Sequence, residues 1–197
     1  VRDIKDGQQI HAIGDLIHYA VGMMGIRERD IQLSNDEQKN LFNLVQAISN
    51  TSFTLDIYGA GELEKELHDF ALANNVAVNF CGVRSNKELA KIYNKYRYYI
   101  LPSVVEGMPK TLLEAMSSGC LCIGTDAPGI NEIIRNGETG ILAKSTSVED
   151  LTDAIHRAVS EQDKNTIINK GVSFIHEVCD VDKIVEEEYQ IMSKMIK

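Results

Sequence analysis

The sequence has 197 residues, 44% of them hydrophobic, which is enough to bury the core of one ordinary domain. Its formal net charge is −9 and its lysines and arginines form no cluster, which argues against a nucleic-acid-binding protein, because such proteins neutralise phosphates with a basic surface. A small anionic ligand needs only a few local donors and stays compatible with this charge.

In chain order, residues 1–38 show little regular pattern, and 20–26 (AVGMMGI) is the candidate for a first strand. From residue 39, segments with helical spacing alternate with short apolar segments typical of buried strands. The expected helices cover 39–48, 62–74, 85–94, the stretch from Pro109, 129–134, 148–159, 164–177 and 181–196, and the expected strands cover 53–59, 76–82, 98–102, 121–125 and 140–143. We therefore expect an amino-terminal segment (1–38) that includes the first strand, a domain over 39–178, and a carboxyl-terminal helix in 179–197.

Regular alternation of strands and helices predicts an α/β fold: a Rossmann-like, doubly wound parallel sheet with helices on both faces. Such sheets bind ligands in a crevice at the carboxyl ends of their strands. The loops that follow Tyr58, Phe80, Leu101 and Gly124 are therefore the expected site of function.

Neither a metal site nor a membrane span is indicated. The four cysteines (Cys81, Cys120, Cys122 and Cys179) have no CxxC spacing, and no histidines complete a zinc set. We expect Cys120 and Cys122 to be small buried residues of a strand and infer a reducing compartment. No apolar run approaches the ~20 residues of a membrane span and no signal peptide is visible, so we expect a cytoplasmic protein.

The stretch LPSVVEGMPKTLLEAMSSG (101–119) places Glu106 just before an expected helix start and Glu114 two turns into that helix. The free N–H groups at such a start, together with the helix dipole, attract anions, and Gly107 lets a ligand approach the backbone. Glu114 lies where it could accept the hydroxyls of a ribose whose phosphates sit at the helix start. The ordinary alternatives are a helix cap for Glu106 and a solvated charge for Glu114.

The run EGMPKTLLEAMSSGCLCIGTDAPGINEIIRNGETGIL resembles the signature of the retaining, nucleotide-sugar-dependent glycosyltransferases with the GT-B fold (glycosyl transferases group 1). The resemblance extends to DIYGAGELEKELHDFA, NFCGVRSNKELAKIY and YYILPS and covers roughly residues 39–160. In that family, two Rossmann-like domains form the enzyme, and the carboxyl-terminal one binds the sugar donor. The resemblance thus implies that this chain is a donor-binding domain.

The resemblance also implies roles for individual residues. Glu106 would contact the donor sugar and position it for transfer, Glu114 would bind the ribose diol, and Lys39 would neutralise the diphosphate. The remaining implied donor-binding residues are the helix start (Gly107, Met108, Pro109 and Lys110), the glycine turn (Gly59 and Gly61) and the loop that holds the base (Val83 and Arg84). The family pattern requires no metal and no cofactor for this chemistry.

The chain departs from the family in two respects. The family carries an arginine about five residues before the lysine, which in this sequence falls near Ser34; Arg27 or Arg29 is the candidate, while Gln32 stands nearest in alignment and lacks the charge. The acceptor-binding amino-terminal domain, which holds the family's catalytic histidine, is not in this sequence, so His11 and His18 receive no role. We expect a fragment of a longer protein that is inactive without that domain.

The implied function is transfer of a hexosyl-type sugar from a UDP or GDP sugar to a glycan, lipid or small-molecule acceptor, with retention, in glycan, polysaccharide or glycolipid synthesis. Membrane contact, where present, would be peripheral and through the missing domain. Two alternatives stay open: a nucleotide-sugar epimerase of the same fold, and a non-catalytic module that only binds nucleotide sugars.

Overall fold

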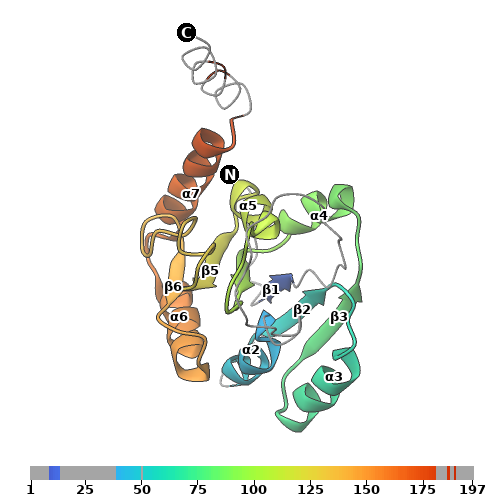
Figure 1. Cartoon of the computed structure of the whole chain (residues 1–197). Helices are drawn as coiled ribbons and strands as arrows, with labels where there is room; N and C mark the ends of the chain where they lie inside the picture. The colour runs from blue at the N-terminus through green and yellow to red at the C-terminus, as the bar shows by residue number, and fades with distance from the viewer. Residues whose placement is uncertain (1–8, 14–38, 50, 181–185, 187–188, 190–197) are drawn as a thin grey trace, which may run out of the picture.

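The computed structural model describes residues 9–13 (backbone only), 39–49, 51–180, 186 and 189. Its sheet has six strands, all parallel, in the order β3-β2-β1-β4-β5-β6 (Figure 1). The strands are β1 (Gln9–Ile13), β2 (Thr54–Tyr58), β3 (Val78–Gly82), β4 (Tyr98–Leu101), β5 (Leu121–Thr125) and β6 (Ile141–Ala143). This order confirms the predicted doubly wound sheet, in which the chain runs outward from β1 to one edge and then returns to fill the other half.

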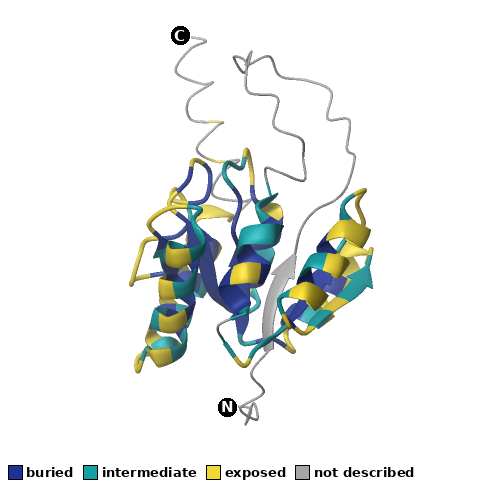
Figure 2. Cartoon of the chain, turned by 90° about the horizontal axis from the view of Figure 1, so that it is seen from below, coloured by how far each residue is buried: buried dark blue, intermediate teal, exposed yellow. Residues whose placement is uncertain are grey.

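The helices lie on both faces of the sheet (Figure 1). They are α2 (Leu41–Ile48), α3 (Glu64–Ala73), α4 (Asn86–Tyr93), α5 (Lys110–Ser117), α6 (Val148–Ser160) and α7 (Lys164–Val178). Helices α2, α3 and α6 cover one face, while α4 and α5 cover the other with α7 packed beside α5. Figure 2 shows exposed residues on the outer surfaces of the helices and buried residues where the helices meet the sheet.

Each face has its own core because the side chains of a strand alternate between faces. In β2, Leu55 and Ile57 belong to the first core, where the fully buried Leu44 and Val45 of α2 also lie. The second core, beneath α4 and α5, differs in character because it contains the buried phenols Tyr93 and Tyr99 beside aliphatic residues. Buried hydroxyl groups need hydrogen-bond partners, so this layer also carries the polar contacts described below.

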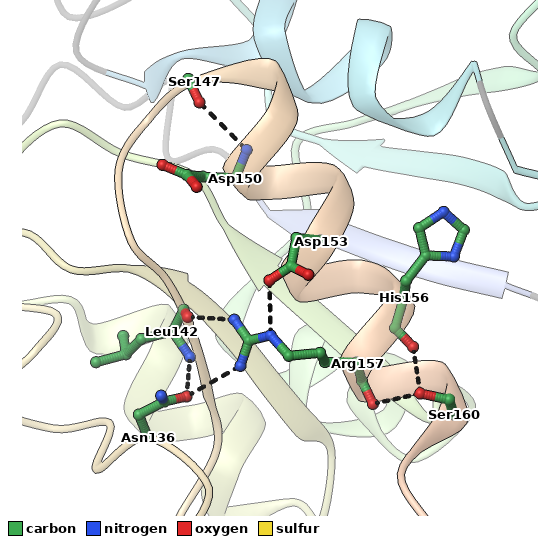
Figure 3. Close-up of polar contacts among 8 residues, drawn as sticks. All are labelled: Asn136, Leu142, Ser147, Asp150, Asp153, His156, Arg157 and Ser160. Carbon is green, nitrogen blue, oxygen red and sulfur yellow. Dashed lines mark hydrogen bonds and ion pairs between the residues drawn. The ribbon is translucent and has the colours of Figure 1, made fainter.

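Helix α6 is fixed at both ends by polar contacts (Figure 3). Its N-cap Ser147 accepts a hydrogen bond from the N–H of Asp150 (3.2 Å). Near the other end, the Arg157 guanidinium donates to the Leu142 carbonyl oxygen (2.8 Å) and forms an ion pair with Asp153 (2.8 Å). Because Leu142 belongs to β6, these contacts hold α6 and the loop before it at a set position on the sheet.

The strand suggested at 20–26 is not the first strand of the sheet. That strand is Gln9–Ile13, which pairs with β2 on one side and β4 on the other, and residues 20–26 lie outside the described part of the chain. The QIHAI sequence is short and mixes polar with apolar residues, so it gives only a weak strand pattern. Residues 20–26 are more apolar and therefore gave the stronger strand signal, although glycines weaken a strand. The helix expected over 181–196 also lies outside the described residues, apart from 186 and 189.

The helix predicted at 129–134 is wrong, because this segment forms consecutive turns. The N–H groups of Ile130 and Asn131 both donate to the Ala127 carbonyl oxygen, and Gly129 has a φ of +81°. An added Cβ at Gly129 would lie 2.0 Å from the carbonyl oxygen of Glu106. The segment therefore bends to let the loop of Glu106 pass against its backbone, which a regular helix would prevent.

Gly129→Ala should destabilise the domain for two reasons: the left-handed φ, which costs about 1–2 kcal/mol, and the collision with Glu106, which adds about 1–3 kcal/mol. We expect the free energy of unfolding, measured by urea denaturation, to fall by their sum, about 2–5 kcal/mol. Gly137→Ala is the matched control, because Gly137 has a φ of +75° but no atom within 4 Å of an added Cβ. Equal losses in both variants would show that the close approach to Glu106 contributes nothing.

Candidate functional site

The site lies where β1 and β4 are neighbours in the sheet although distant in sequence. After β1, the next described helix, α2, lies on one face of the sheet, whereas after β4 the chain continues to α5 on the other face. Diverging connections of this kind open a crevice at the carboxyl edge of a doubly wound sheet. Residues 102–109 join β4 to α5 at this edge.

Glu106 and Lys39 are in direct contact at this edge. The Lys39 Nζ atom lies 2.8 Å from Oε1 of Glu106, and their side chains are only 13% and 12% exposed. The hydroxyl of Ser103 donates to the same carboxylate oxygen at 2.6 Å. Two residues that the sequence assigned to the sugar and to the diphosphate therefore meet in one charge cluster.

Glu106 is not the cap of α5. No described side chain caps that helix, whose N-cap residue is Pro109. The carboxylate instead uses its hydrogen bonds on Lys39 and Ser103. The ordinary alternative for Glu106, a helix cap, is thus wrong.

The loop that carries Glu106 is fixed by hydrogen bonds to β5 and to the turns that follow it. Ser103 is fully buried, and its carbonyl oxygen accepts a hydrogen bond from the hydroxyl of Thr125, at the end of β5. The N–H of Glu106 donates to the Pro128 carbonyl oxygen (3.0 Å). The position of the carboxylate is therefore set by the neighbouring strand and by the turns at 127–134.

Lys39 is placed by the residue that follows it. Asn40 has a left-handed backbone (φ 56°, ψ 34°), which asparagine tolerates better than most residues. Its side-chain amide donates to the carbonyl oxygens of Thr146 (2.8 Å) and Pro102 (3.2 Å), in the loops after β6 and β4. Asn40 thus ties the start of α2 to the carboxyl edge and directs Lys39 toward Glu106. Neither Asn40 nor Ser103 was predicted; an asparagine just before an apolar helical pattern was the available signal.

The start of α5 lies one residue later than expected. The helix begins at Lys110, and Pro109 stands just outside it. The N–H of Lys110 donates to the Met108 carbonyl oxygen (2.9 Å), and proline has no N–H, so the predicted backbone donors reduce to Gly107 and Met108. Both are exposed, and an added Cβ at Gly107 would meet no atom within 4 Å. The glycine leaves open space beside the helix start.

Glu114 is half-buried on α5 rather than a fully solvated charge. The hydroxyl of Tyr93, at the end of α4, donates to its Oε2 atom at 3.2 Å. Glu114 lies four positions after the first helical residue, Lys110, which corresponds to about 6 Å along the axis at ~1.5 Å per residue. A ribose at Glu114 and a diphosphate at the helix start are compatible with that separation.

The glycine turn that follows β2 and the loop assigned to the nucleotide base, which follows β3, are neighbours. Gly59, with a φ of 140°, donates its N–H to the Gly82 carbonyl oxygen (3.1 Å). Beyond Gly82, Val83 is 55% exposed, and the exposed Arg84 donates to the Val83 carbonyl oxygen (2.9 Å). These exposed residues stand at the carboxyl edge beyond β3, consistent with a place for the base. The turn at Gly59 and Gly61 lines a small apolar pocket together with Leu41, Phe42, Ile57, Leu63, Glu64, Leu67 and Phe80.

A buried polar network lies beneath this edge and was not predicted. Asp56, only 6% exposed, accepts hydrogen bonds from Asn79 (2.7 Å) and from the hydroxyl of Tyr96. Tyr96 in turn contacts the hydroxyl of Tyr58 (3.1 Å). Burial, and then the Asp56 carboxylate, raise the pKa of Tyr96 well above its ordinary value, so this phenol keeps its proton and serves as a donor. The only sequence signal was an aspartate inside the apolar run FTLDIYG.

Several predicted residues lie outside the described part of the chain. Arg27 and Arg29, the candidates for a second phosphate-binding cation, fall in the segment 14–38, as do Gln32 and His18. His11 belongs to β1, whose backbone alone is described. A second cation for the diphosphate therefore stays a prediction.

Two of the four cysteines, Cys120 and Cys122, are buried as expected, whereas Cys81 is partly exposed and Cys179 is exposed. Cys120 and Cys122 are 2% and 0% exposed, and burial raises the pKa of the Cys120 thiol to about 12 and that of Cys122 well above its ordinary value. Among the described residues, no three His, Cys, Asp or Glu side chains gather to hold a metal ion. Within the same residues, no helix is long and apolar enough to cross a membrane.

Two sequence relatives are informative. The GtfA subunit of a UDP-N-acetylglucosamine–peptide N-acetylglucosaminyltransferase from Streptococcus pneumoniae is 35% identical over 122 residues, which are 58% of this chain and 24% of the relative. An Escherichia coli UDP-Gal:α-D-GlcNAc-diphosphoundecaprenol α-1,3-galactosyltransferase is 29% identical over 133 residues, 65% of this chain and 34% of the relative. The chain spans less than half the length of the curated relatives it matches.

Solved structures of glycosyltransferases share the fold. HepE of Anabaena, in complex with UDP and glucose, superposes with a TM-score of 0.76 at 18% identity, covering 95% of this chain and 48% of HepE. Pneumococcal GtfA, in complex with UDP and GlcNAc, gives 0.73 at 20% identity, covering 96% and 36%. These neighbours identify the sheet and its helices as one half of a GT-B fold.

The profile of one protein family, described as glycosyl transferases group 1, matches residues 34–172. The match begins before Lys39, includes both Glu106 and Glu114, and ends within α7. It therefore takes in every described element from α2 to most of α7. The chain belongs to the glycosyl transferases group 1 family.

Proposed function

We propose that this chain binds the nucleoside diphosphate sugar of a glycosyltransferase that moves a hexosyl-type sugar to a glycan, lipid or small-molecule acceptor with retention. The observation that carries the proposal is the contact of Lys39 with Glu106, just before the start of α5. The site combines a cation (Lys39), a carboxylate (Glu106) and the exposed start of α5. A second carboxylate, Glu114, lies on the same helix. This set matches the parts of a sugar diphosphate: phosphates, sugar and ribose.

The proposed chemistry is electrostatic. As the sugar leaves, negative charge builds on the diphosphate while the sugar gains cationic character, and both changes are stabilised by groups already in position. Lys39 and the N–H groups near Met108 act on the diphosphate, and Glu106 acts on the sugar. This assignment uses no resident metal or cofactor.

UDP sugars are the first donors to test. The structural neighbours HepE and GtfA are complexes with UDP, and the relatives GtfA and the E. coli galactosyltransferase have UDP sugars in their names. The diphosphoundecaprenol in the E. coli name makes a lipid-linked glycan one candidate acceptor here, with a role in glycan or glycolipid synthesis. A cytoplasmic protein, peripheral to the membrane through another part of the polypeptide, would suit such an acceptor and the free cysteines of the described residues.

UDP should bind this chain at least tenfold more tightly than uridine, because Lys39 and the helix start act on phosphate and each charged hydrogen bond contributes about 1.5–3 kcal/mol. Isothermal titration calorimetry on the 197-residue chain measures both affinities, with the GDP and guanosine pair run alongside. Equal affinities of nucleoside and diphosphate in both pairs would rule out the proposed phosphate site.

Glu106→Gln should bind plain UDP about two- to tenfold more tightly than wild type, because Lys39 is released from its ion pair and no longer divides its charge between carboxylate and phosphate. The affinity for the UDP sugar should increase less than that for UDP, or should fall, since the variant weakens the contact with the sugar. Calorimetry with UDP and UDP-glucose or UDP-N-acetylglucosamine measures the difference. Glu132→Gln, at an exposed position, is the control. Weaker UDP binding in Glu106→Gln would contradict the competition.

Glu114→Gln should weaken UDP and UDP sugar alike, because both contain ribose. Loss of a charged acceptor costs about 1.5–3 kcal/mol, or roughly ten- to a hundredfold in affinity. Thermal melts of the same samples check folding. Unchanged binding of both ligands would return Glu114 to an ordinary partly buried carboxylate.

The chain alone should bind a donor without transferring its sugar at a useful rate, because orientation of the acceptor against the donor accounts for about 7–11 kcal/mol of such barriers in good cases. Product analysis with a longer protein that adds an acceptor domain distinguishes the outcomes. A new glycosidic bond supports the transferase, a changed sugar epimer supports an epimerase, and tight binding with no product supports a binding module.

A further inference from the structure

Tyr93, the last residue of α4, is a core residue to which no role in binding has yet been given. It is 1% exposed, and its hydroxyl donates to Oε2 of Glu114 across the gap between α4 and α5. A core residue on one helix thereby contacts the carboxylate that the proposed function places on the ribose.

The surroundings of Tyr93 keep its hydroxyl at this place. Its ring packs edge-to-face on that of Tyr99, with centroids 6.2 Å apart and an interplanar angle of 71°. Tyr99 is also fully buried and exchanges a hydrogen bond with the hydroxyl of Thr111 (2.9 Å), in the first turn of α5. The phenol of Tyr99 therefore attaches the first turn of α5 to strand β4, and the phenol of Tyr93 attaches the next turn to α4. A buried phenol is costly to leave unpaired, which favours the contact with Glu114.

We propose that Tyr93 is a positioning residue for ribose: it fixes the rotamer of Glu114 so that the carboxylate faces the diol of the nucleotide. The proposal rests on the proposed function. A glutamate side chain that is free in solution loses rotamer freedom when a ligand binds, and this loss weakens binding. With Tyr93 in place, the Glu114 side chain loses this rotamer freedom when the protein folds, so the loss no longer weakens the binding of a ligand. A carboxylate has about four acceptor positions, so one phenol leaves capacity for both ribose hydroxyls.

The expected consequence is selectivity for ribose. The aligned carboxylate gains from the 2′-hydroxyl, whereas a 2′-deoxynucleotide offers one donor fewer. Tyr93→Phe keeps the buried ring and removes only the hydroxyl, so it separates positioning from packing. Tyr99→Phe is the matched control, because it removes an equally buried hydroxyl that bonds to Thr111 instead of Glu114.

The test is calorimetric titration of the 197-residue chain with UDP or GDP, whichever wild type binds more tightly, and with its 2′-deoxy analogue. Tyr93→Phe should weaken the ribonucleotide about three- to tenfold and the deoxynucleotide less, so the ratio of the two affinities falls. Tyr99→Phe should leave that ratio unchanged. In a Glu114→Gln background, Tyr93→Phe should have no further effect on either ligand, because the group it positions is gone.

Two results would overturn the proposal in distinguishable ways. If Glu114→Gln weakens the ribonucleotide while Tyr93→Phe leaves the affinity ratio unchanged, or acts equally in the Glu114→Gln background, Tyr93 does not position the carboxylate and the proposed function survives. If Glu114→Gln itself changes nothing, the assignment of Glu114 to ribose fails and this proposal fails with it.

Discussion

The contact between Lys39 and Glu106 is the constraint on which the rest of the site depends. Two charges with side chains only 13% and 12% exposed lose much of their hydration, and a buried pair is often no more stable than apolar residues of the same size. It therefore indicates function better than it explains stability. The fold also adds specific support, since Ser103 supplies a hydrogen bond to the carboxylate and Asn40 holds the residue next to the lysine. Gly129 makes room for the backbone of Glu106.

The two faces of the sheet differ in composition and in role. The face under α2 and α6 is packed mainly with aliphatic side chains and gives the domain its core. The face under α4 and α5 carries phenols whose hydroxyls reach Asp56, Thr111 and Glu114. Polar side chains in a core require partners and so restrict how the elements can be arranged. This layer thus sets the position of α5, on which the helix start and Glu114 both depend.

Much of the fold was predictable from local pattern, and much of the site was not. Strands β2 to β6 appear as short apolar runs, so the parallel sheet follows, whereas β1 does not stand out because QIHAI is brief and its neighbours in the sheet come from distant parts of the chain. The segment 129–134 has helical spacing but yields to the close approach of Glu106. Glu106 and Glu114 stand out from their places at and after an expected helix start, whereas Lys39 was identified through resemblance to a family. Their mutual contacts, and those of Ser103 and Tyr93, arise only from tertiary structure.

The ion pair also bears on the order of events that the proposed function requires. Under the proposed function, a complete donor would offer phosphates to Lys39 and sugar hydroxyls to Glu106, so both charges would exchange one partner for another when it binds. UDP left after transfer satisfies only the lysine and leaves a poorly solvated carboxylate without its cation, which is unfavourable. Re-forming the pair then works against the retained product. The same contact that opposes the binding of plain UDP would thus favour the intact donor over the spent one, a difference in affinity that a transferase needs in order to turn over.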